Sequence, residues 1–198
     1  MKKMIKKLFI ILMLSLFSQN LLVANESVLS IGSENAKITV RVFSSLTCPH
    51  CANFHEKIFE NLKKEYIDTN KVKFEHHGFP LDLAALNAEK VLRSVKGKEK
   101  SFQFLGEIYK KQNQWAVGSD INKINDYIIK VGIDFGLSDT RMNEFIKNEK
   151  IQDEILNERI EAQKNYNISS TPTIYINKKK YEGTHDFKLF KKAIEKLL

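Results

Sequence analysis

The spacing of apolar residues in the first part of the chain predicts a strand, a helix and a second strand. Residues 38–43 form an apolar run rich in β-branched and aromatic side chains, which is typical of a strand. Apolar residues then recur at helical spacing between Ala52 and Leu62. A second strand is predicted over 71–77, before the turn at Gly78. This part of the fold therefore has the order β-α-β.

The rest of the chain is predicted to hold a long helical insertion and then a second region that contains strands. Between residues 82 and 166, apolar side chains recur at spacings of three and four, which predicts helices almost throughout. The strand pattern returns over 173–176, followed by a turn and a short strand at 179–181. An amphipathic helix over 187–198 closes the chain. This order predicts an α/β fold with a helical insertion at about 82–166.

The first 24 residues have the pattern of a secretory signal peptide. Lysines at positions 2, 3, 6 and 7 precede an apolar stretch at 8–17, and cleavage is predicted after Ala24. Because Leu22 stands where a small residue is preferred, the alternative is an uncleaved N-terminal membrane anchor, although the apolar stretch is short for a bilayer. Either interpretation places the globular part in an oxidising compartment, where disulfides persist.

The charge of the chain argues against a nucleic-acid partner. Its formal net charge is +8 at pH 7, and the four leader lysines account for half of this value. Elsewhere, lysines alternate with acidic residues along most of the helical stretches, which indicates a solvated surface of mixed charge. We therefore expect no binding of nucleic acid.

The two cysteines of the chain form the motif Cys48-Pro49-His50-Cys51 between the first strand and the first helix. Pro49 suits the first turn of a helix, because its missing N–H would have no intrahelical partner there. Cys48 is then expected at the helix start, where free N–H groups and the positive end of the helix dipole stabilise a thiolate. The motif predicts a redox-active dithiol.

Two other roles for the cysteine pair are weaker. A structural disulfide that closes a four-residue loop stabilises a protein by only about 2 kcal/mol in the chain-entropy description. A zinc site needs two more ligands, and the spacing of His55, His76, His77 and His185 does not match a zinc-binding histidine pair. We therefore expect neither a metal nor a cofactor.

The cysteine motif and a second segment together resemble the DsbA-type thiol:disulfide oxidoreductases, which are thioredoxin-fold proteins of the bacterial cell envelope. The matching segments are Phe43–Cys51 and Ser170–Ile176, and Lys180–Gly183 resembles a Tyr-x-Gly segment of these proteins. The likeness covers about residues 28–198. It implies a thioredoxin fold with an inserted helical subdomain.

The resemblance also implies roles for individual residues. Cys48 would be the exposed nucleophile that forms mixed disulfides, and Cys51 would be the buried thiol that closes or releases the redox-active disulfide. His50 would stabilise the Cys48 thiolate. Thr171-Pro172 would be a cis peptide beside the disulfide, and the backbone of Thr171 would bind an extended substrate segment.

One residue departs from the family pattern. Many relatives carry a buried glutamate six residues before the first cysteine, where it is thought to assist proton movement at the buried thiol, and this chain has Val42 there. Water or another group would have to serve the buried thiol in its place.

The function that the resemblance implies is a periplasmic oxidoreductase that introduces disulfide bonds into exported proteins through Cys48 and Cys51. Its partners would be exported polypeptides with free thiols and a membrane quinone-linked protein that reoxidises it. Two alternatives stay open. One is a disulfide reductase or isomerase of the same fold, and the other is a non-enzymatic periplasmic peptide-binding chaperone.

Overall fold

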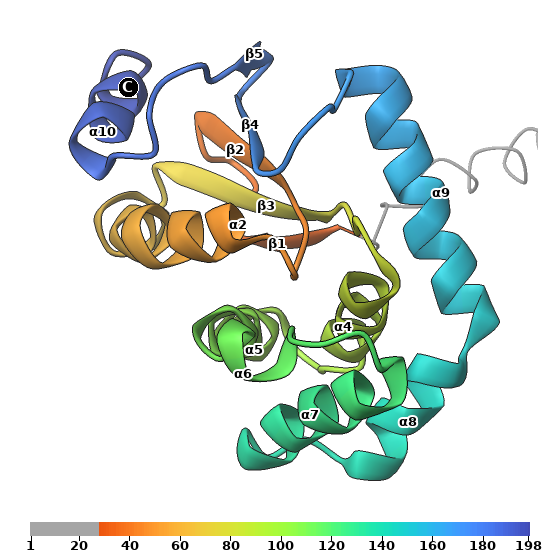
Figure 1. Ribbon diagram of the computed structural model, residues 1–198. Helices are drawn as coiled ribbons and strands as arrows, with labels where there is room; N and C mark the ends of the chain where they lie inside the picture. Colours follow the sequence, from red (N-terminus) through yellow and green to blue (C-terminus); the bar gives the residue numbers. More distant parts are fainter. Residues whose placement is uncertain (1–27) are drawn as a thin grey trace, which may run out of the picture.

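A five-stranded mixed sheet lies at the centre of the computed structural model, which describes residues 28–198, so the predicted signal peptide at 1–24 lies outside the described residues. The strands are β1 (Leu29–Ile31), β2 (Ile38–Ser44), β3 (Val72–Gly78), β4 (Thr173–Ile176) and β5 (Lys179–Lys180), in the spatial order β1-β3-β2-β4-β5. β2 and β3 are parallel, and the other neighbouring pairs are antiparallel (Figure 1). The apolar pattern predicts each of these strands except β1.

The helix that follows β2 contains two π-helical segments. It runs without a break through α2 (Pro49–Phe54), η2 (His55–Phe59), α3 (Glu60–Leu62) and η3 (Lys63–Ile67). The apolar spacing predicts this helix but not its π-helical turns, which are rare and are frequently found at functional sites. The cysteine motif forms the first turn of this helix.

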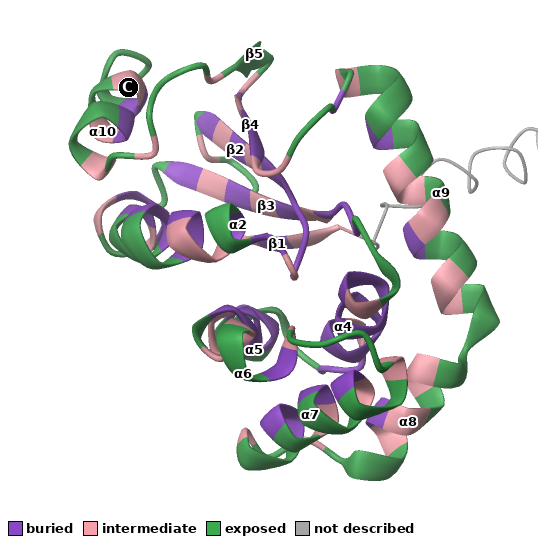
Figure 2. Ribbon diagram, in the orientation of Figure 1, coloured by how far each residue is buried: buried purple, intermediate pink, exposed green. Residues whose placement is uncertain are grey.

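Six helices lie between β3 and β4. They are α4 (Leu83–Arg93), α5 (Lys98–Lys110), α6 (Gln112–Trp115), α7 (Ile121–Asp134), α8 (Asp139–Lys147) and α9 (Glu149–Tyr166). α4 is the central one, since it packs against its neighbours on several sides and its residues 85–92 are all buried (Figure 2). None of the helices within residues 28–198 is both long enough and apolar enough to cross a membrane.

Polar side chains fix where several of these helices begin. The side chains of Asp82, Asp120, Ser138 and Asn148 each accept a hydrogen bond from a backbone N–H in the first turn of α4, α7, α8 and α9. Asp186 does the same for the C-terminal helix α10 (Phe187–Glu195). Such caps satisfy N–H groups that have no partner within the helix, and each contributes about 1 kcal/mol.

The two faces of the sheet differ in what covers them. Side chains alternate along a strand, so Val42 and Ser44 on β2 share one face with Phe74 and His76 on β3. The core on this face includes residues of α2, η2, α4 and α5. The opposite face carries a smaller apolar cluster around Phe43 at the C-terminal end of α9. The sheet is thus a partition between a large core and a small one.

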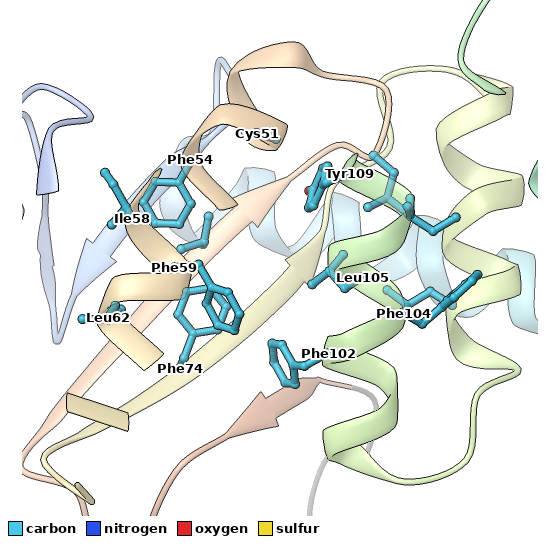
Figure 3. Packing of buried hydrophobic residues seen from close by; sticks show 14 of the residues in the cluster. Cys51, Phe54, Ile58, Phe59, Leu62, Phe74, Phe102, Phe104, Leu105 and Tyr109 are labelled. Carbon is cyan, nitrogen blue, oxygen red and sulfur yellow. The ribbon is translucent and has the colours of Figure 1, made fainter. Parts of the chain in front are cut away.

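Three aromatic rings join the sheet, the cysteine-bearing helix and the insertion (Figure 3). The ring of Phe59 lies 4.7 Å from that of Phe74 on β3 and 5.5 Å from that of Phe102 on α5, measured between centroids. All three side chains are buried. Because these rings come from three separate parts of the chain, their packing holds the insertion against the sheet.

We predict that Phe59→Ala lowers the free energy of unfolding by about 3–5 kcal/mol, since it removes a ring from the point where the three parts meet. Urea denaturation measures this change. The matched control is Ile160→Ala on α9, where the side chain is 57% exposed and the change should stay within about 0.5 kcal/mol. Equal losses for the two variants would contradict the central role of Phe59.

Candidate active site

The backbone after β2 brings Cys48 to the start of α2. Cys48 has extended backbone angles and occupies the N-cap position, and Pro49 is the first helical residue. The N–H groups of Cys51 and Ala52 donate to the Cys48 carbonyl oxygen at 3.0 and 3.2 Å, which closes the first helical turn. Both cysteines are free thiols in this structure. The Cys48 sulfur therefore lies at the positive end of the helix.

Hydrogen bonds to the Cys48 sulfur favour its ionised form. The Cys51 thiol is the strongest contributor, and Thr171 and the backbone N–H groups of Cys51 and His50 add to it. Burial acts against them, but together they lower the pKa of the Cys48 thiol from 9.0 to about 5. A cysteine at a helix N-terminus is expected to behave in this way. Cys48 is therefore a thiolate at neutral pH.

Cys51 has the opposite properties. Its side chain is only 1% exposed, and burial, followed by the neighbouring Cys48 sulfur, raises the pKa of its thiol far above the ordinary value. Since an anion in this position would be poorly solvated, Cys51 stays protonated in the dithiol form. The two cysteines thus hold different charges although they are three residues apart.

The segment before β4 completes the site. The Thr171-Pro172 peptide bond is cis, as the resemblance implies, and the Thr171 carbonyl oxygen lies 3.3 Å from the Cys48 sulfur, which donates a hydrogen bond to it only in the protonated form. His50 is exposed beside the cysteines. The Cys48 side chain is less accessible than the resemblance implies, because the residue is 9% exposed. The structure thus brings all of these residues to one place.

Two further residues at this site are not indicated by the sequence. Gln112 on α6 donates from Nε2 to the carbonyl oxygens of Leu46 and Cys48, at 2.7 and 3.1 Å, and so attaches the insertion to the loop that carries the nucleophile. His185 lies near Cys48; burial, and then His50, lower the pKa of its imidazole. The sequence around Gln112 or His185 forms no recognisable motif. Both residues are far from the cysteines along the chain and come close to them only when the chain folds.

Val42 is apolar, but the residue that pairs with it on the next strand, His76, is polar. Val42 is buried, and the parallel register places His76 of β3 directly beside it. His76 Nε2 lies 3.3 Å from Oε2 of Glu89 on α4, and both side chains are buried. Within residues 28–198, no cluster of three or more His, Cys, Asp or Glu side chains could hold a metal ion.

Comparison with known proteins agrees with this geometry. The family model described as Thioredoxin matches residues 24–196. The crystal structure of alpha-DsbA1 from Wolbachia pipientis superposes with a TM-score of 0.81 at 27% identity, covering 87% of this chain and 91% of that one. The chain belongs to the DsbA-type family of the thioredoxin superfamily. The helices between β3 and β4 are the helical insertion of this DsbA-type fold.

This chain covers different shares of its other relatives. Disulfide bond formation protein D of Bacillus subtilis is 28% identical, over 85% of this chain and 76% of that protein. Relatives from Rickettsia bellii and Rickettsia typhi are 30% and 31% identical over 77% and 74% of this chain, which spans 58% and 53% of their respective lengths. This DsbA-type chain therefore spans just over half the length of these rickettsial relatives.

The two thiol pKa values predict how the stability of the reduced protein depends on pH. The pKa of Cys48 is lower in the folded chain than in the unfolded chain, so its ionisation adds stability as the pH rises from about 5 to about 9. This contribution is lost as the pH falls back through 5. The pKa of Cys51 is shifted upward, so above about pH 9 its ionisation in the unfolded chain favours unfolding.

Urea denaturation of the reduced protein and of Cys48→Ser, over this pH range, measures the contribution of Cys48. We expect the stability advantage of the unmodified protein to grow between pH 5 and pH 9. A difference that stays constant over this range would show that the folded chain leaves the pKa of Cys48 unchanged.

Proposed function

We propose that this protein is a thiol:disulfide oxidoreductase that acts as an oxidase and donates a Cys48–Cys51 disulfide to exported polypeptides. The observation that carries the proposal is the position of Cys48 at the start of α2, where the hydrogen bonds around its sulfur lower the pKa of the thiol. A thiol of low pKa is a good leaving group in disulfide exchange. Stabilising this thiolate stabilises the reduced protein, so the disulfide form tends to oxidise other thiols.

The reaction divides the work between the two sulfurs. A client thiolate attacks Sγ of Cys48, the bond between Cys48 and Cys51 breaks, and its electron pair remains on the Cys51 sulfur, which takes up a proton. A second client thiolate then attacks the client sulfur of the mixed disulfide and releases Cys48 as a thiolate. Two electrons pass from the client thiols to the cysteine pair, and the client gains one disulfide.

Two other parts of the site would serve the client and the thiolate. His50, exposed next to Cys48, stabilises the thiolate through an imidazole N–H. The Thr171 backbone, whose carbonyl oxygen lies 3.3 Å from the Cys48 sulfur, pairs with an extended segment of the client. Thr171-Pro172 thus holds the substrate beside the nucleophile.

The cellular setting follows from the same chemistry. The signal-like pattern of residues 1–24 supports export to the periplasm, where a dithiol can cycle through the disulfide. Each turnover leaves the cysteines reduced, so a membrane quinone-linked protein would reoxidise them. The relative from Bacillus subtilis bears the name disulfide bond formation protein, which supports this direction of the reaction.

The reduction potential of the cysteine pair tests the direction of the reaction. We predict that equilibration with glutathione buffers gives a potential well above that of thioredoxin, about −270 mV, because the folded protein stabilises the Cys48 thiolate. A potential as low as that of thioredoxin would instead indicate a reductase.

A double variant, Cys48→Ser with Cys51→Ser, separates the enzyme from a chaperone, since a chaperone would keep its activity.

A trapping experiment tests the roles of the two cysteines. We predict that Cys51→Ala accumulates mixed disulfides between Cys48 and client proteins, because the nucleophile remains while the thiol that resolves the complex is missing. Non-reducing electrophoresis detects these adducts, and Cys48→Ala is the matched control. Adducts formed by Cys48→Ala, and not by Cys51→Ala, would reverse the two roles.

A further inference from the structure

The loop before α2 forms a turn that leaves one carbonyl oxygen without a backbone partner. The Cys48 N–H donates to the Ser45 carbonyl oxygen at 3.1 Å, so Leu46 and Thr47 lie at the centre of the turn. Leu46 is buried, and its carbonyl oxygen accepts no hydrogen bond from a backbone N–H of residues 28–198. Such an oxygen needs a side-chain partner, because leaving a buried acceptor unpaired is costly.

Gln112 on α6 is that partner, and it serves a second oxygen as well. Its Nε2 lies 2.7 Å from the carbonyl oxygen of Leu46 and 3.1 Å from that of Cys48. One amide group carries two N–H donors, so it can bond both oxygens at once. The Cys48 oxygen also accepts the N–H groups of Cys51 and Ala52, which close the first turn of α2. Gln112 therefore joins the cysteine loop and the start of α2 to α6.

Trp115 holds Gln112 in this position. It lies one helical turn further along α6, is fully buried, and donates from Nε1 to the carbonyl oxygen of Ile108 on α5 at 2.8 Å. Residues three apart lie on the same side of a helix. The buried indole thus orients the side of α6 that carries Gln112. The position of the amide at the cysteine loop depends on how the helical insertion packs.

We propose that Gln112 is a positioning residue for Cys48, and that its two hydrogen bonds fix the loop so that the Cys48 sulfur reaches the groups that stabilise its thiolate. This inference rests on the proposed exchange reaction at Cys48 and Cys51. In the disulfide form, the covalent bond to Cys51 itself holds the Cys48 sulfur in place. In the dithiol form, the hydrogen bonds of the loop do so. Losing the Gln112 bonds therefore weakens the reduced form more than the oxidised form.

A purely structural role for Gln112 has a different consequence. If the amide only attached the insertion to the loop, its loss would destabilise the oxidised and the reduced protein equally. The free energy of unfolding would then fall while the reduction potential stayed the same. The potential and the titration of the Cys48 thiol therefore distinguish a positioning residue from a structural one.

Both quantities are measured in Gln112→Ala. We expect the acid dissociation constant of the Cys48 thiol, followed by the ultraviolet absorbance of the thiolate, to fall about tenfold, which is the net value of about one hydrogen bond. The reduced form then loses the same factor of stabilisation. Equilibration with glutathione should therefore give a potential about 30 mV lower than that of the unmodified protein, which makes the variant a weaker oxidant.

Two further variants and a control separate the hydrogen bonds from the bulk of the side chain. Gln112→Glu keeps the shape but turns oxygen atoms toward the two carbonyl oxygens, so it should lower the potential at least as far as Gln112→Ala. Gln112→Lys restores N–H donors and should bring the thiol titration at least back to that of the unmodified protein. The matched control is Gln114→Ala, at an exposed position of the same helix, which should change neither value.

Trp115 is the one tryptophan of the chain, so its fluorescence shows whether α6 stays in place. A shifted titration with unchanged emission in Gln112→Ala supports the positioning role. An unchanged titration and potential would overturn it, as would an equal shift in Gln114→Ala or a shift accompanied by altered emission. Failure of the unmodified protein to exchange with glutathione would overturn the exchange reaction itself, while the thiol titration would still test Gln112.

Discussion

The structure depends on holding two identical side chains, three residues apart, in opposite states of protonation. The first turn of α2 creates the difference, because it places one sulfur among free N–H groups and the other beneath the helix. The Cys51 thiol is itself the strongest of the hydrogen-bond partners that lower the pKa of Cys48. Its burial keeps the proton in place for that hydrogen bond. The reactivity of one cysteine is therefore a consequence of the burial of the other.

The helical insertion also contributes to the chemistry of the site, because one of its helices donates a hydrogen bond to the cysteine loop. α5 packs against α2, the helix that carries the cysteines, and α6 follows α5. They also bring the Tyr109 hydroxyl into the core and the Gln112 amide to the carbonyl oxygen of Cys48. α4 brings Glu89 to the end of β3. The insertion thus contributes polar groups to the site as well as apolar packing.

Sequence patterns predict the parts of this fold that repeat with a regular period. β2, β3 and β4 have apolar or alternating patterns, and the cysteine motif has a fixed place between a strand and a helix. β1 has only three residues, too few to establish an alternation, and it is ordered by its pairing with β3. Glu89 is next to other polar residues on α4, which resembles a solvated face, and only the packing around α4 shows that it is buried.

The strand next to Val42 carries a polar side chain at the same level of the sheet. Adjacent parallel strands place side chains of the same register on the same face, so a polar group absent from β2 can be supplied by β3 one strand away. His76 occupies that neighbouring position and holds Glu89 beside it. A buried ionisable pair is seldom favourable for stability alone, because desolvation opposes the attraction between its members. The burial of this pair is therefore not evidence that it makes the fold more stable.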